Sequence, residues 1–153
     1  MISGPAVETF LAQPALALVG ASRSGKKFGN FARRELQAKG YRVYPIHPTA
    51  AMIDNVQCYT RFADLPEHVN AALIVVPPEE AVKVVREAAA AGIHRVWLQQ
   101  GAESPEVLHV CQELGVEAVA GECILMFAKP TGYHKAHQWV HRLLGTLRAR
   151  GVM

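Results

Sequence analysis

The sequence has 153 residues and a formal net charge of +3; half of its residues are hydrophobic and 19% are charged. This length suits one domain over residues 1–153, and the composition argues against disorder. The mild positive charge suits an anionic small molecule. Nucleic acid is a less suitable ligand, because the sequence has no basic run of the kind that follows a nucleic-acid backbone. No apolar stretch approaches membrane-spanning length, the N-terminus lacks the layout of a signal peptide, and three scattered cysteines favour a reducing, cytoplasmic compartment.

Residues 15–29 predict a strand, a loop of small and basic residues, and the start of a helix. The apolar run 15–19 has the length of one buried strand. Residues 20–22 are small, which lets the backbone approach a phosphate closely. The loop then becomes basic, at Arg23, Lys26 and Lys27, and a helical pattern begins near Gly29. This order is typical of sites in which loop amides and a helix N-terminus hold phosphates.

Two well-known phosphate-binding motifs fit this loop poorly. Gly20, Gly25 and Lys26 have the spacing of a Walker A loop, but Lys27 stands where that motif needs Ser or Thr to hold magnesium. A nicotinamide-dinucleotide fingerprint would have its second glycine where Ser22 stands. The strand that follows should also end in an acidic residue that holds the ribose, and this one does not. The loop therefore disfavours both a P-loop NTPase and a nicotinamide-dependent protein.

The remaining sequence alternates between apolar strands and amphipathic helices. We expect strands at residues 41–46, 56–59, 71–76, 96–98 and 116–119, helices at 7–11, 29–39, 78–91 and 105–114, and a turn or short helix at 50–53. Helical spacing predicts these inward-facing side chains: Phe28, Phe31, Ala32 and Leu36, then Ala81, Val84, Val85, Ala88 and Ala89, then Val107, Leu108, Cys111 and Leu114. The alternation predicts an α/β fold: a Rossmann-like parallel sheet with helices on both faces.

We expect the core of the domain at about residues 15–126, followed by a C-terminal helix at about 134–148 that has an apolar stripe. This helix is expected to close the sheet; the alternative is a contact with a second copy of the chain or with a partner protein. In such a fold, ligands bind at the carboxyl ends of the strands. The loops at residues 20–27, 45–48, 76–78 and 99–101 should therefore converge on one crevice.

Six short motifs in series resemble the stand-alone CoA-binding proteins, whose fold is that of the nucleotide-binding domain of the succinyl-CoA synthetase α subunit. The motifs are VGAS at residues 19–22, PIHP at 45–48, CY at 58–59 with LP at 65–66, VVPPE at 75–79, WLQQG at 97–101 and GECI at 121–124. The chain departs from the family pattern at His47, where many members have asparagine before the proline.

The resemblance implies that the ligand is coenzyme A (CoA) or an acyl-CoA, bound without catalysis by this chain. By similarity, the phosphates meet Gly20, Ala21, Ser22 and Arg23; the adenosine part lies beside His47 and Pro48; the nucleotide follows Val76, Pro77 and Pro78; and the pantetheine lies beside Gln99, Gln100 and Gly101. The loop without a ribose-binding acid but with Arg23, Lys26 and Lys27 also suits a diphosphate and a 3′-phosphate. The alternative is an enzyme, or a subunit of one, that uses an acyl-CoA or NAD(P).

Other reactive side chains favour neither a metal site nor catalysis. His134, His137 and His141 have helical spacing but no acidic residue between them, so we expect a solvated face and no metal. Cys123 follows the last strand on the ligand side, where it would meet the CoA thiol or be a buried, inert side chain. Glu122 has no base or nucleophile paired with it. The phosphorylated histidine of the synthetases belongs to a second domain, so we do not expect synthetase activity from this chain alone.

Overall fold

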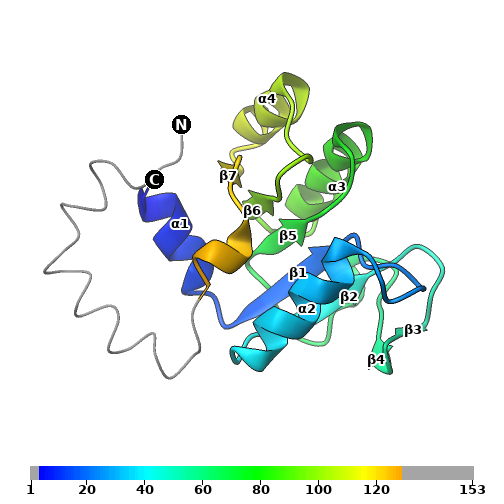
Figure 1. The fold of residues 1–153 in the computed structure, drawn as a ribbon. Coiled ribbons are helices and arrows are strands. Elements are labelled where there is room, and N and C mark those ends of the chain that lie inside the picture. The colour runs from blue at the N-terminus through cyan, green and yellow to red at the C-terminus, as the bar shows by residue number, and fades with distance from the viewer. Residues whose placement is uncertain (1–3, 129–153) are drawn as a thin grey trace, which may run out of the picture.

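The computed structural model describes residues 4–128, which form a five-stranded parallel sheet flanked by helices, with a separate two-stranded hairpin (Figure 1). The sheet contains β1 (Ala15–Val19), β2 (Arg42–Ile46), β5 (Ala72–Ile74), β6 (Arg95–Leu98) and β7 (Glu117–Ala120) in the order β2–β1–β5–β6–β7. The helices are α1 (Gly4–Leu11), α2 (Phe28–Ala38), α3 (Pro78–Ala90) and α4 (Pro105–Glu113), with short 3₁₀ helices η1 (Phe62–Asp64) and η2 (Ile124–Met126). The predicted α/β, Rossmann-like fold is confirmed.

Helices cover both faces of the sheet, as predicted. Leu16 and Leu18 of β1 pack with α1 and α2, whereas Ala15 and Ala17 belong to the cluster that α3 and α4 cover. Alternate residues of a strand point to opposite faces, so both sets are apolar and both faces are buried. Figure 1 shows α3 and α4 together on one side of β5 and β6.

The register brings the carboxyl ends of the strands into one row. Val19 pairs with both Ile46 and Ile74, Ile74 pairs with Leu98, and Leu98 pairs with Ala120. The residues that follow these positions therefore lie along one edge of the sheet, in the spatial order His47, Gly20, Val75, Gln99 and Gly121. The strand order reverses between β1 and β5, which is the switch point where such folds bind ligands.

The predicted inward faces of α2 and α4 are confirmed at Ala32, Leu36, Val107 and Cys111, which are buried, but three predicted inward residues are exposed. Phe28 and Phe31 are 39% and 47% exposed, and the buried polar residues of α2 are instead Asn30 and Arg33. Gly29, between them and the buried face, lies against the loop before α2, where a Cβ would be 2.4 Å from the Gly20 carbonyl oxygen. In α4, Val110 takes the inward position predicted for Leu108, which is exposed. The capping role predicted for Ser104 is confirmed, since its side chain accepts a hydrogen bond from the Val107 amide at 3.2 Å.

The turn or short helix predicted at residues 50–53 is wrong. Strand β3 (Met52–Ile53) pairs antiparallel with β4 (Val56–Gln57), and the turn between them is Asp54–Asn55. Both turn residues have positive φ, 51° and 62°, as the common two-residue hairpin turn requires. The predicted strand 56–59 ends early, but Tyr59 continues the pairing with β2 through hydrogen bonds to Pro45 and His47.

The predicted C-terminal helix, with its histidines and its closing or interaction role, lies outside residues 4–128. Within residues 4–128, no helix has both the length and the apolar character needed to cross a bilayer.

Candidate functional site

Two glycines bring the end of β1, the end of β5 and the start of α2 into backbone contact. Gly20 has φ +125°, and a Cβ atom added to it would lie 2.1 Å from the Val75 carbonyl oxygen. A Cβ on Gly29 would lie 2.4 Å from the Gly20 carbonyl oxygen. No side chain fits between these backbones. The N-terminus of α2 therefore lies against the carboxyl end of β1, which is where Rossmann-like folds hold phosphates.

Asn30 fastens the loop at residues 20–27 to the first turn of α2. Its Oδ1 accepts hydrogen bonds from the amides of Ser22 at 2.9 Å and Lys27 at 3.3 Å, and its Nδ2 donates to the Ser22 carbonyl at 2.9 Å. The side chain is fully buried. Asn30 was not among the predicted site residues; the signal for it in the sequence is a polar residue three positions into a helix that follows a glycine-containing loop.

Three amides of the loop donate hydrogen bonds within the loop itself. The hydroxyl oxygens of Ser22 and Ser24 accept from the amides of Ser24 and Lys26 at 3.1 and 3.2 Å, and the Gly25 amide donates to the Ser22 carbonyl at 3.0 Å. With the bonds to Asn30, five of the loop amides, those of Ser22, Ser24, Gly25, Lys26 and Lys27, have acceptors within the protein. The amides of Phe28 and Gly29, which precede the first two amides that donate to the Lys27 carbonyl, and the basic side chains are placed for an anion-binding role.

Arg23 connects the loop after β1 with the loop after β2. Its Nη2 donates to the Thr49 hydroxyl at 2.5 Å. Beside it, His47 Nδ1 accepts from the amides of Thr49 and Ala50 at 3.1 and 2.9 Å, which leaves the imidazole proton on Nε2. Burial and, to a smaller degree, the charge of Arg23 lower the pKa of His47. Near neutral pH this edge of the site thus offers one guanidinium and one neutral N–H donor.

The remaining candidates of the first three loops lie where the topology predicts. Lys26 and Lys27 are exposed at the end of the loop after β1. Pro77 and Pro78 start α3 directly after β5, and the half-buried Val76 lies next to the loop after β1 because the Val75 amide donates to the Val19 carbonyl at 2.7 Å. The structure thus brings these loops together at one edge of the sheet.

Gln99, Gln100 and Gly101 join the loop after β6 to the segment after β7. Gln99 is buried, and its Oε1 accepts from the Ile124 amide at 3.1 Å, so part of this side chain is structural. Gln100 Nε2 donates to the Gly121 carbonyl at 3.4 Å. Gly101 has φ +96° and open space around its Cβ position, so backbone conformation is the reason for glycine there.

Cys123 is half-buried and directly precedes η2, at the end of the row farthest from His47. Its segment is fixed by Trp97, whose Nε1 donates to the Glu122 carbonyl at 2.9 Å. Cys111 is buried as predicted, and burial raises its pKa to about 11. Within residues 4–128 there is no group of three residues that would hold a metal ion.

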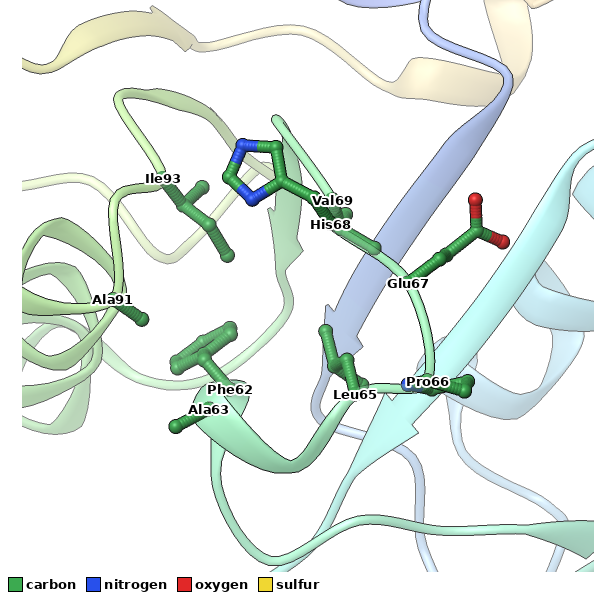
Figure 2. A pocket seen from close by; sticks show the side chains of 9 residues that line it. All are labelled: Phe62, Ala63, Leu65, Pro66, Glu67, His68, Val69, Ala91 and Ile93. Carbon is green, nitrogen blue, oxygen red and sulfur yellow. The ribbon is translucent and has the colours of Figure 1, made fainter.

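A hollow of about 310 Å³ lies at the opposite edge of the sheet, where the chain leads into β5 and β6 (Figure 2). Figure 2 shows Phe62, Leu65 and Ile93 around it, with Glu67 directed away. Glu67 instead pairs with Arg42 at the start of β2, with Nε–Oε2 and Nη2–Oε1 distances of 2.7 and 2.8 Å. This hollow is therefore separate from the row of predicted site residues.

The chain is similar in sequence to known CoA-binding proteins. Residues 15–129 match the family model described as a CoA binding domain. The chain is 28% identical over 121 residues to an ADP-forming acetate–CoA ligase I of Archaeoglobus fulgidus, a match that covers 72% of this chain but only 18% of the ligase. The chain therefore spans less than a fifth of the length of this relative.

Solved structures agree with the fold. A conserved hypothetical protein from Pyrococcus furiosus superposes with a TM-score of 0.69 and 38% identity, over 73% of this chain and 97% of that one. The dinucleotide-forming acetyl-coenzyme A synthetase 1 of Ca. Korarchaeum cryptofilum, in its apo form, superposes with a TM-score of 0.60 and 28% identity, over 69% of this chain and 25% of that one. Since the family model covers most of the sequence, the chain belongs to the family of CoA-binding domains.

Proposed function

We propose that the chain binds CoA or an acyl-CoA at the carboxyl edge of its sheet and performs no catalysis of its own. The observation that carries this proposal is the contact of Gly20 with Val75 and Gly29, which leaves no room for side chains where a helix N-terminus meets the switch point of the sheet. A diphosphate fits such a place because the α2 dipole and the adjacent cations favour negative charge.

The charges around the site favour CoA over a nicotinamide dinucleotide. A protein that binds NAD places an acidic side chain after its second strand to hold the ribose hydroxyls. Here that position has His47, with Arg23 close by. A carboxylate would repel the 3′-phosphate of CoA, whereas a guanidinium and an N–H donor attract it. Arg23, Lys26 and Lys27 are the side chains that we assign to the phosphates.

The order of the strands suits an extended ligand. The row runs from His47 through Gly20 and Val76 to Gln99, across four neighbouring strands, or about 14 Å at the usual strand spacing. We propose that the adenosine lies at His47 and Pro48, the diphosphate at Gly20, Ala21 and Ser22, the nucleotide against Val76, Pro77 and Pro78, and the pantetheine at Gln99, Gln100 and Gly101. The thiol end then points toward Cys123.

The proposal of binding without catalysis is compatible with the contacts of the reactive side chains. In residues 4–128, no hydrogen bond joins a serine or cysteine to a histidine, as an activated nucleophile would require. The three cysteines of this part of the chain are all free.

Ligand titration of the purified full chain, followed by thermal unfolding, tests the proposal. CoA at a hundred times its dissociation constant should raise the free energy of unfolding by about 2.7 kcal/mol. Dephospho-CoA, NADPH and ATP are the comparison ligands, and mass spectrometry of the natively purified protein identifies any ligand that it carries. Stabilisation by NADPH or ATP without stabilisation by CoA would refute the proposal.

A second candidate is that the chain holds CoA for a ligase whose other parts are supplied by a partner. The similarity to an acetate–CoA ligase, confined to less than a fifth of that protein, favours it. Incubation of the chain with acetate, ATP and CoA distinguishes the cases. Formation of acetyl-CoA and ADP by the chain alone would contradict a pure binding role. Turnover that requires a second protein would support the ligase.

A further inference from the structure

Asp54 joins the tip of the β3–β4 hairpin to two arginines of α2. Its Oδ2 accepts hydrogen bonds from Arg34 Nη1 at 2.8 Å and from Arg33 Nη2 at 3.4 Å. The same Nη1 atom of Arg34 also donates to the Gly25 carbonyl at 3.2 Å. One guanidinium therefore connects the hairpin tip with the turn of the loop at residues 20–27.

The hairpin tip and the loop also fit together sterically. A Cβ on Gly25 would lie 2.7 Å from Asp54 Oδ1, and Gly25 has φ +73°. Asp54 itself has a positive φ, a conformation that aspartate tolerates better than most residues. Gly25 and Asp54 therefore meet at a point where each has a positive φ, and each is a residue type that tolerates this conformation.

The charge of Asp54 has a clear structural reason. The Arg33 side chain is only 5% exposed, and its Nε has no hydrogen-bond partner among the described residues, so Asp54 is the carboxylate that neutralises it. A carboxylate beside a site for a polyanionic ligand is otherwise unfavourable, because it repels the ligand. The presence of Asp54 beside the site indicates that its interactions with Arg33 and Arg34 stabilise the protein by more than the repulsion costs.

We propose that Asp54 is a positioning residue, which holds the loop at residues 20–27 in its binding conformation through Arg34 and Gly25. The inference rests on the proposed function, since it assigns the hairpin to the same CoA site. The hairpin is then a strap across the loop: the carboxylate fixes Arg34, and Arg34 fixes the Gly25 carbonyl.

The variant Asp54→Asn tests the role through the direction of its effect. Positioning predicts that CoA affinity falls at least about tenfold, the equivalent of 1.4 kcal/mol. A purely electrostatic role predicts the opposite, because the substitution removes a negative charge near an anionic ligand. The matched control is Glu67→Gln, which removes the carboxylate of an arginine pair at the other edge of the sheet and should leave CoA affinity unchanged.

Amide hydrogen exchange of the ligand-free chain gives a readout that does not depend on CoA. In Asp54→Asn, the amides of Ser22, Gly25 and Lys27 should exchange at least about tenfold faster than in the parent, whereas Glu67→Gln should not change them. If the parent chain does not bind CoA but Asp54→Asn still speeds the exchange of these amides, the proposed function is refuted and the role of the strap is kept. Unchanged exchange, or affinity that is unchanged or higher, would overturn the strap.

Arg34→Gln is the second variant, and it keeps the test decisive if Asp54→Asn does not fold. Arg34 is 45% exposed, and its loss leaves the buried Arg33–Asp54 pair intact while removing the bond to Gly25. It should reproduce the faster exchange of the loop. If both variants fold, their effects on CoA affinity should be strongly non-additive, since both break the same connection; additive effects would contradict the inference.

Discussion

Asn30 and Ser22 exchange two hydrogen bonds, one in each direction: the Ser22 amide donates to Asn30 Oδ1 and Asn30 Nδ2 donates to the Ser22 carbonyl, both at 2.9 Å. A side-chain amide supplies both a donor and an acceptor, on separate atoms of one group. The conformation of the loop after β1 therefore depends on a residue that belongs to the helix after it, and that need not touch the ligand.

Asn30→Ala should destabilise the chain and weaken CoA binding together. The substitution leaves the amides of Ser22 and Lys27 and the Ser22 carbonyl without this partner, at a cost of about 2–3 kcal/mol in the free energy of unfolding. Urea unfolding measures this change, and CoA titration measures the effect on the site. Asn70→Ala, at an exposed position, is the control and should change stability by less than about 0.5 kcal/mol. Equal stability of the two variants would contradict the role of Asn30.

Gly20→Ala should be much more damaging than Gly121→Ala, although both glycines have positive φ, +125° and +80°. An added Cβ meets the Val75 carbonyl in the first case and nothing within 4 Å in the second. The backbone strain of Gly121→Ala alone costs about 1 kcal/mol. The clash at Gly20 adds at least about 2 kcal/mol and should abolish CoA binding. Thermal unfolding of both variants checks this, and similar melting temperatures would show that the contact relaxes easily.

Local sequence patterns were sufficient for the five strands of the parallel sheet and for their shared edge. The bounds of β1 follow from its apolar run, and Ser104 caps α4 as its spacing with Pro105 predicts. Both features depend on residues that are neighbours in the sequence. The arrangement of the loops at one edge follows because all five strands of the sheet are parallel. The family resemblance, which the family model confirms, rests on those same loops.

Features set by contacts between distant residues could not be predicted in this way. The contact of Gly29 with Gly20 joins the helix to the end of β1, and helical spacing alone could not show it; the same spacing wrongly predicted Phe28 and Phe31 as inward-facing. The β3–β4 hairpin has two residues in each strand, too few for an alternating pattern. Asp54 appears as an ordinary turn residue in the sequence, because its arginine partners lie 20 and 21 positions earlier.

Glu67 should stabilise the chain only modestly and in a pH-dependent way. Hydrogen bonds from Arg42 and Tyr44 lower the pKa of Glu67 to about 2. Because this pKa is lower in the folded than in the unfolded chain, the contribution is fully present above about pH 4.5 and disappears as the pH falls toward 2. The side chain is 32% exposed, so solvent screening limits it to less than about 1 kcal/mol. Urea unfolding of the parent and of Glu67→Gln from pH 7 down to about pH 3 should show the difference shrinking; a constant difference would contradict the pairing.

His47 should make the stability of the chain depend on pH in a higher range. Its Nδ1 accepts two amide hydrogen bonds, and a proton on that atom would break both. Burial and the charge of Arg23 lower its pKa below the ordinary value of about 6.5, so the unfolded chain takes up a proton before the folded one. The contribution of the neutral His47 side chain to stability is then fully present above about pH 6.5 and is lost as the pH falls through that value toward the pKa of His47 in the folded chain.

His47→Asn is the matched variant for this test, because an asparagine Oδ1 accepts the same turn amides without titrating. We expect the free energies of unfolding of the two proteins to run parallel above about pH 7, and the parent to lose stability relative to the variant as the pH falls below about 6.5. Chemical unfolding across this range measures the difference. Parallel curves down to pH 5 would show that the imidazole is protonated without opening the turn, and would remove His47 as the neutral N–H donor beside Arg23.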